Sequence, residues 1–365
     1  KVLLRNSAVI VDTTKSVDKD NVNDVTSMLS SLPKVVLHDH LDGGVRAQTV
    51  VDLASRLGGK LSGMGSDEVL AVLQRGAGNE RSLVSYLEAF PLVTDLLRTT
   101  EDLHRVAREA VTDLVRDGVL HAEIRFAPQL YSRWGITLDD AIEAVSDGVL
   151  GEAQRLGISA GVLVCGMRDQ DDLSALSDVV ERWHGSGHVV GFDLAGDELG
   201  HPVTKHAEVL RSLALAGVPL TIHAGESASW QSVKDALDAT YWRSRIGHGV
   251  QAFENPEFVS ELVMRDVHLE VCPSSNLHTG VYPSIEDHPV DHLLKAGVQV
   301  SISADNRTMS STTTTSELLL LVETFNWGPK ELYAVQHNAL EAANCSEETK
   351  SRVRGALDEW VSSRD

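Results

Sequence analysis

Short apolar, β-rich runs alternate with amphipathic stretches from Pro33 onward, and this alternation limits the fold more than any other feature of the sequence. The candidate strands are residues 35–37, 121–126, 159–164, 189–194, 219–223, 245–248, 268–272 and 298–303. Helical stretches lie between or after them at 138–156, 173–183, 204–216, 230–239, 256–264 and 316–325. Strands that alternate with helices form βαβ units, so the sequence predicts an α/β protein with a parallel sheet.

Eight strand and helix repeats favour a (β/α)8 TIM barrel, in which functional residues lie at the carboxyl ends of the strands. A doubly wound sheet is the second interpretation, but no GxGxxG follows the first strand to support a dinucleotide site. Residues 43–120 form a long insertion between the first two strands, with an apolar helical pattern at Leu83, Tyr86, Leu87 and Phe90. This pattern is consistent either with ordinary packing or with a helical cap over the barrel mouth.

The chain has 365 residues, which would allow two or three domains at roughly 150 residues each. The continuous strand and helix pattern instead predicts one barrel domain over residues 31–365. Residues 1–30 are polar and charged, and we interpret them as an N-terminal extension outside the core.

Thirty-two Lys and Arg residues against 53 Asp and Glu give a net charge of −21, which repels a phosphate backbone. Nucleic acid is therefore not expected as a partner, and the expected ligands are small and neutral or cationic. The longest apolar run, residues 318–322, is far shorter than the ~20 residues that cross a bilayer. Three widely spaced cysteines, Cys165, Cys272 and Cys345, suit a reducing compartment, so we expect a cytoplasmic protein without a membrane partner. Its oligomeric state is left open.

Unusual polar residues recur where the predicted strands end. They are His38, His40 and Asp42 after the first strand, His223 and Glu226 after the fifth, His248 after the sixth, and Asp305 and Asn306 after the eighth. Histidines at positions i and i+2 of an extended chain face the same side. Three His and one Asp offer nitrogen and oxygen ligands to a divalent metal, which zinc satisfies best, while iron, nickel, cobalt and manganese stay open. Glu226 suits proton transfer, and His248 suits the orientation of a water molecule.

Six segments in chain order resemble the adenosine deaminases of the amidohydrolase superfamily. They are LPKVVLHDHLDGG (32–44), DLAGDE (193–198), TIHAGE (221–226), RIGHG (245–249), VCPSSN (271–276) and SISADN (301–306). The resemblance covers the chain from about Leu32 to at least Glu323.

The resemblance implies a role for each matching residue. His38, His40, His223 and Asp305 would bind one Zn²⁺ per chain, Glu226 would donate a proton to purine N1, and His248 would hold a water and help to deprotonate it. Gly196 would offer its backbone N–H to purine N3, and Asp42 would lie near the ribose hydroxyls. Met167 and the apolar residues Leu83, Tyr86, Leu87 and Phe90 would line or cover the pocket.

The chain departs from the common family pattern in three places. Asn306 stands where many members have Asp, and its amide would donate to purine N7. Residues 227–232 form an unexpected loop, and the leader before the first motif is long.

The implied reaction is the hydrolytic deamination of adenosine or 2′-deoxyadenosine to inosine or 2′-deoxyinosine and ammonia. The net charge of −21 disfavours phosphorylated substrates. The alternatives are a deaminase of a related 6-aminopurine, such as a modified nucleoside or adenine, a barrel metal-hydrolase of phosphoesters or amides, and a non-catalytic purine-binding protein.

Overall fold

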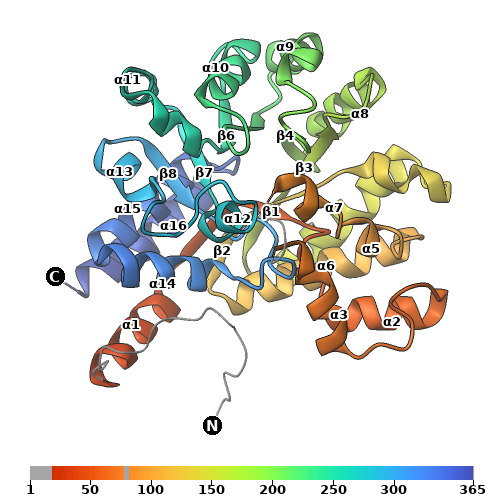
Figure 1. Ribbon diagram of the computed structural model, residues 1–365, viewed down its shortest axis with the longest axis horizontal. Coiled ribbons are helices and arrows are strands. Elements are labelled where there is room, and N and C mark those ends of the chain that lie inside the picture. The colour runs from red at the N-terminus through yellow and green to blue at the C-terminus, as the bar shows by residue number, and fades with distance from the viewer. Residues whose placement is uncertain (1–18, 78–81, 365) are drawn as a thin grey trace.

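Eight parallel strands form the centre of the molecule in a computed structural model that describes residues 19–77 and 82–364. Each strand pairs with the next one in the sequence, and the helices surround them (Figure 1). The strands are β1 (Lys34–His40), β2 (Val119–Phe126), β3 (Ser159–Met167), β4 (Val189–Ala195), β5 (Leu220–Ala224), β6 (Ser244–His248), β7 (His268–Val271) and β8 (Gln299–Ile302). All eight predicted strands are confirmed, with ends that differ by up to three residues.

The last strand returns to the first, which makes the sheet a barrel. Asp39 and Asp305 form a parallel bridge between these two edges. The amide of Asp305 donates to the carbonyl of His38 at 3.2 Å, and the amide of His40 donates to the carbonyl of Asp305 at 2.8 Å. The (β/α)8 prediction is therefore confirmed, and the doubly wound alternative is wrong because its strand order would have to reverse.

The helices that follow the strands lie around the barrel, except for the short helix after β7, which lies over its centre (Figure 1). They are α7 (Leu138–Leu156), α8 (Ser174–Gly185), α9 (Ala207–Leu215), α10 (Trp230–Ala239), α11 (Pro256–Met264), α12 (Pro273–His278), α13 (Val290–Lys295), α14 (Thr314–Phe325), α15 (Pro329–Ala342) and α16 (Glu347–Ser362), with 3₁₀ turns η2 (Pro128–Trp134), η3 (Val203–His206) and η4 (Val250–Glu254). Helices α7, α10 and α11 match their predicted bounds. Helices α15 and α16 were not predicted, although Pro329 and the capping residue Ser346 are start signals.

The insertion between β1 and β2 is helical. It contains α2 (Ala47–Leu57), α3 (Ser66–Leu73), η1 (Gln74–Ala77), α4 (Leu83–Leu87), α5 (Pro91–Thr94) and α6 (Thr100–Arg116). Thr99 caps α6 by accepting a hydrogen bond from the amide of Asp102, so that helix begins where the sequence provides a capping residue. Of the apolar residues for which a cap was predicted, Leu83, Tyr86 and Leu87 lie on α4, and Phe90 is the N-cap of α5.

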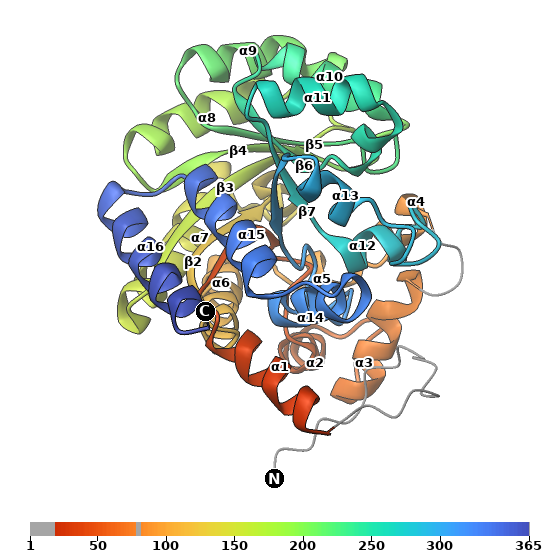
Figure 2. The ribbon, with the colours of Figure 1, turned by 90° about the vertical axis from the view of Figure 1, so that its left-hand side faces the viewer.

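The N-terminal segment ends in helix α1 (Lys19–Ser31), and residues 1–18 lie outside the described residues. Helix α1 lies beside α14 and near the end of α16 (Figure 2). Leu29 is 1% exposed and belongs to the hydrophobic core, and Trp360 donates from Nε1 to the carbonyl of Met28. The described end of the predicted polar extension thus packs on the barrel.

Among the described residues, none of the helices combines the length and the apolar character needed to span a bilayer.

Candidate active site

The carboxyl ends of the strands enclose a cavity of about 370 Å³. Every residue that the sequence placed in the site lines this cavity, except for His38, which is fully buried beside it. The lining residues among those predictions are His40, Asp42, Leu83, Tyr86, Leu87, Phe90, Met167, Gly196, His223, Glu226, His248, Asp305 and Asn306. Residues from six strand ends and the β1–β2 insertion therefore meet around one cavity, although they are far apart in the sequence.

Three imidazoles converge on one carboxylate. Nε2 of His40 lies 3.1 Å from Nε2 of His223 and 3.4 Å from Oδ1 of Asp305. Nε2 of His38 lies 3.2 Å from the same Asp305 oxygen. Four ligand atoms that could each hold a cation thus face a common centre.

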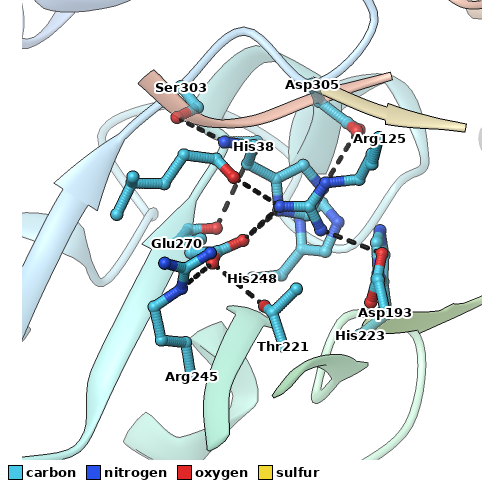
Figure 3. Close-up of polar contacts among 12 residues, drawn as sticks. His38, Arg125, Asp193, Thr221, His223, Arg245, His248, Glu270, Ser303 and Asp305 are labelled. Carbon is cyan, nitrogen blue, oxygen red and sulfur yellow. Dashed lines mark hydrogen bonds and ion pairs between the residues drawn. The ribbon is translucent and has the colours of Figure 1, made fainter. Parts of the chain in front are cut away.

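Two carboxylates below this centre set the tautomers of His38 and His223 (Figure 3). Nδ1 of His38 lies 2.9 Å from Glu270, and Nδ1 of His223 lies 3.0 Å from Asp193. A carboxylate accepts, so both rings carry their proton on Nδ1 and direct the lone pair of Nε2 toward the cavity. Carboxylates commonly orient metal-binding histidines in this way.

The polar atoms at the centre lack other partners, as expected of metal ligands. Nε2 of His38 and Oδ1 of Asp305 are buried without a conventional hydrogen bond. Among the described residues, two overlapping groups have ligand atoms within 4.8 Å of one another: His38, His223, His248 and Asp305, and His40, Asp193 and His223. The oxygens of Asp193 are already used by His223 and Arg125. The remaining donors fit a divalent metal bound by imidazole nitrogen and carboxylate oxygen.

A buried ionic network supports this arrangement from inside the barrel (Figure 3). Arg125 donates to Asp193 at 2.9 Å and to Glu270 at 2.7 Å, and Arg245 donates to Glu270 at 2.7 Å. All four residues are buried, with at most 8% of their surface exposed. Sequence reasoning missed these supporting residues, although charged side chains inside otherwise apolar strands are a signal that could have found them.

The pKa values of the histidines follow from burial and nearby charge. Burial lowers the pKa of His40 well below its usual value and also lowers that of His223. For His38, burial and Arg125 lower the pKa, but the nearby carboxylates of Asp305 and Glu270 outweigh them and raise it. The carboxylates of Asp305 and Glu270 therefore favour a positive charge at the position of His38.

Two residues that face the cavity have left-handed backbones, which non-glycine residues adopt only rarely. The φ angles are 60° at His248 and 61° at Asp305. The hydroxyl of Ser275 donates to Oδ2 of Asp305 at 2.6 Å, so this carboxylate keeps its other oxygen free for the centre. Uncommon backbone geometry of this kind is concentrated at functional sites.

Glu226 lies beside His248 and is itself buried. Its Oε2 is 3.7 Å from Nε2 of His248, and the hydroxyl of Thr279 donates to its Oε1 at 3.2 Å. Burial raises the pKa of Glu226 well above its usual value, and the charges of Asp305 and Glu198 raise it further. A carboxyl group in this environment holds its proton more strongly than a free one, which suits a general acid.

The turn that carries Glu226 is held by Glu198, which sequence reasoning quoted in a motif but gave no role. The carboxylate of Glu198 accepts hydrogen bonds from the amides of four consecutive residues, 225–228, at 2.6 to 3.1 Å, and from the hydroxyl of Ser232. The unexpected loop 227–232 is therefore part of this support, and none of its residues lines the cavity.

Two glycines are required by the shape of the site. Gly196 has a φ of 112°, which disfavours any side chain at this position of the lining. At Gly43, a Cβ atom would come within 1.9 Å of Oδ1 of Asn306. Asn306 is consequently packed against the backbone after β1, at the edge of the cavity.

The rest of the lining is apolar on one side and acidic on another. Tyr86 and Phe90 form an edge-to-face pair with ring centroids 5.9 Å apart. Burial raises the pKa of Asp42 to about 6, although its hydrogen bonds with backbone amides lower it.

Sequence reasoning gave no role to several further lining residues, which include Cys165, Asp169, Asp197 and His201. The described lining residues include no Lys or Arg.

Comparison with known proteins identifies relatives over most of the chain. The family model described as adenosine deaminase matches residues 33–360. An adenosine deaminase from Mycobacteroides abscessus is 39% identical over 332 residues, which cover 86% of this chain and 91% of that protein. One from Mycobacterium sp. strain JLS is 38% identical over 334 residues, with 86% and 91% covered.

Solved structures of similar fold include proteins of several specificities. An adenine deaminase from Arthrobacter aurescens has a TM-score of 0.83 at 25% identity, with 91% of this chain and 99% of that chain covered. An amidohydrolase from Burkholderia ambifaria with bound Zn has the same TM-score and identity, with 96% and 95% covered. An Arabidopsis N6-mAMP deaminase has a TM-score of 0.80 at 26% identity, with 91% and 99% covered.

Proposed function

This chain belongs to the adenosine deaminase family, which makes it a hydrolytic enzyme, and we propose that it deaminates adenosine and 2′-deoxyadenosine with the help of one zinc ion. The observation that carries the proposal is the cavity itself. It combines a His and Asp cluster that fits a metal with a buried Glu226 whose pKa is raised.

The ligands in this proposal are His38, His40, His223 and Asp305. Support for zinc comes from the donor set and from the Burkholderia ambifaria relative, which binds it. When bound, zinc supplies an acidified water, because it lowers the pKa of water from about 15.7 to about 7.

The protein's own residues then act on the purine ring. Glu226 donates its proton to N1, which draws electrons from C6 and makes that carbon a better acceptor for the water oxygen. His248 holds the attacking water near C6. A C6–O bond forms, the bond from C6 to the amino nitrogen breaks, and ammonia leaves, so adenosine and water give inosine and ammonia.

Substrate contacts in the proposal come from the remaining lining residues. Gly196 donates its amide to N3, Asn306 donates its side-chain amide to N7, and Asp42 binds the ribose hydroxyls. Leu83, Tyr86, Leu87 and Phe90 on the insertion cover the base together with Met167, so that water is excluded during the reaction. Their position in the cavity lining supports this role for the insertion as a cap.

The acidic lining supports a neutral nucleoside over a nucleotide. Asp42, Asp169 and Asp197 line the cavity, and the lining has no described Lys or Arg to bind a phosphate. The same lining also supports the nucleoside against the N6-mAMP specificity of the Arabidopsis relative.

The direct test is the change in ultraviolet absorbance when adenosine is added to zinc-loaded protein, since adenine becomes hypoxanthine. Parallel reactions with deoxyadenosine, adenine, N6-methyladenosine and AMP, separated by HPLC, define the substrate. Activity on adenine alone would contradict the proposal and favour the specificity of the Arthrobacter aurescens relative. Phosphate release from a model ester without ammonia would instead indicate a barrel phosphoesterase.

A further inference from the structure

Behind His248 lies a row of buried side chains that the proposed reaction does not use. Nδ2 of Asn276 lies 3.1 Å from Nδ1 of His248, and Oδ1 of Asn276 lies 3.1 Å from Nε2 of His288. The three side chains are between 0% and 1% exposed. They connect His248 to the start of α13 through α12, and we call them the tautomer relay.

The direction of every hydrogen bond in the relay is set at its far end. The backbone amide of Val290 donates to Nδ1 of His288 at 3.2 Å. A backbone N–H can only donate, so Nδ1 of His288 carries a lone pair. Burial lowers the pKa of His288 to about 3, so this ring is neutral and its single proton is on Nε2.

The orientation of the Asn276 amide follows from that proton. Nε2–H of His288 needs an acceptor, which only the oxygen of the amide can provide. The NH₂ group must then face His248, and the reverse orientation would set two donors against each other. The backbone of Asn276 is also held, because its amide donates to Cys272 and its carbonyl accepts from Val281, at 3.0 and 2.9 Å.

We propose that Asn276 and His288 are positioning residues that keep the proton of His248 on Nε2, where it faces the cavity. Asn276 donates to Nδ1, which therefore carries the lone pair, and Nε2 becomes the donor. The consequence for catalysis rests on the proposed function, whereas the assignment of the tautomer does not.

The assigned tautomer removes His248 from the first of the two overlapping groups of ligand atoms. A metal ligand needs a lone pair, and Nε2 of His248 has none while Asn276 donates to its other nitrogen. His248 is thus excluded, and His40 completes the set with His38, His223 and Asp305. It also changes the role expected for His248, which holds the attacking water by donating to its oxygen and cannot take its proton.

The first experiment measures the tautomer directly. Protein labelled with ¹⁵N-histidine and loaded with zinc is studied by NMR, where the two ring nitrogens of a neutral imidazole give distinct shifts. The chain has 15 histidines, and a His248→Asn variant identifies the signals of His248, since Asn tolerates a left-handed backbone. We expect the proton on Nε2. A proton on Nδ1, or a metal-bound Nε2, would overturn the inference.

The second experiment reverses the relay with one isosteric change. In Asn276→Asp the carboxylate can only accept, so the proton of His248 should move to Nδ1. We expect zinc content and KM to stay close to those of the wild type and kcat to fall by at least ~10², because the wrong tautomer of a protease catalytic histidine costs about 10⁴. An unchanged tautomer together with a kcat within about threefold of the wild type would contradict the proposal.

A matched control variant and the wild-type spectrum distinguish failure of the relay from failure of the proposed function. Asn338, on α15, donates to the carbonyl of Val300 at 3.3 Å outside the cavity, and Asn338→Asp should leave kcat and the His248 signals unchanged. The wild-type spectrum needs neither substrate nor a folded Asn276 variant. If no 6-aminopurine is deaminated while Nε2 carries the proton, the proposed function fails and the relay stands. If adenosine is deaminated while Nδ1 carries it, the relay fails alone.

Discussion

At the scale of single residues, the partner of the second ring nitrogen separates the histidines of this site. Carboxylates face Nδ1 of His38 and His223, so these rings present a lone pair to the cavity. An amide faces Nδ1 of His248, so this ring presents a proton. Residues of one type at the same rim therefore differ in chemistry because of neighbours that lie deeper in the barrel.

Glu226→Gln tests the proposed acid at this scale. The amide keeps the shape of the side chain but cannot protonate N1, so we expect kcat to fall by at least ~10² with zinc content unchanged. Steady-state kinetics and metal analysis of the same preparation check this. Near-normal turnover in the variant would remove Glu226 from the role.

The pH dependence of the wild type gives a second view of the same group. The pKa of Glu226 is raised by burial and by the charges of Asp305 and Glu198, so the carboxyl is protonated below that pKa and ionised above it. We expect kcat/KM to fall as the pH rises through this pKa, and the corresponding limb to be absent in Glu226→Gln. A limb that persists in the variant would have to come from another group.

Removal of a proposed ligand should remove the metal. His223→Ala and Asp305→Ala each delete one buried donor of the centre, and outer-sphere changes alone cost about 10- to 100-fold in affinity, so loss of a direct ligand should cost more. Metal analysis after dialysis should show little zinc in both variants. His337→Ala, on the surface of α15, should keep full occupancy. Full occupancy in both ligand variants would show that the assignment is wrong.

The residues that could be predicted from the sequence are those that stand at strand ends within recognisable motifs. Glu270 supports His38 from 232 positions away, and this contact depends on the closure of the barrel. His288 lies in no motif that points to the site, and its contact with Asn276 depends on the packing of the segment after α12. Local patterns thus predict the chemistry that faces the cavity, while its orientation depends on tertiary contacts.

At the scale of elements, the alternation of strands and helices predicted the barrel because buried parallel strands have continuous apolar runs. The helices of the insertion were harder to predict, because α4 and α5 have only five and four residues and are too short to show a helical period. Their apolar residues line the cavity, so their positions depend on tertiary packing more than on helix propensity.

Glu198→Gln tests how one side chain holds an element in place. The carboxylate accepts from four amides of the turn after β5, whereas a glutamine would set its own NH₂ group against some of them. We expect a loss of about 1 to 3 kcal/mol in the free energy of unfolding, together with a lower kcat, because Glu226 lies on this turn. Urea unfolding at fixed zinc concentration and kinetics measure the two effects. The control is Glu359→Gln on the exposed face of α16, and equal stability of the two variants would contradict this role for Glu198.

At the scale of the whole molecule, the net charge and the cavity act in the same direction. The surface has an excess of negative charge, with a formal total of −21, and the cavity lining adds Asp42, Asp169 and Asp197 without a described Lys or Arg. A negatively charged ligand is therefore repelled during its approach and again after it enters. A neutral nucleoside is not repelled at either stage.

Discrimination between adenosine and AMP measures this combined effect. Two unit charges 4 Å apart repel by about 1 kcal/mol in water and about 4 kcal/mol near a protein surface, so kcat/KM for adenosine should exceed that for AMP by at least about tenfold. High salt should reduce the ratio of kcat/KM for adenosine to kcat/KM for AMP, because salt screens the repulsion between exposed charges. Replacing Asp169 and Asp197 by Asn should also reduce this ratio, while kcat for adenosine should stay nearly unchanged. Equal or greater kcat/KM for AMP would mean that a cation outside the described lining binds the phosphate, and the nucleoside specificity would have to be abandoned.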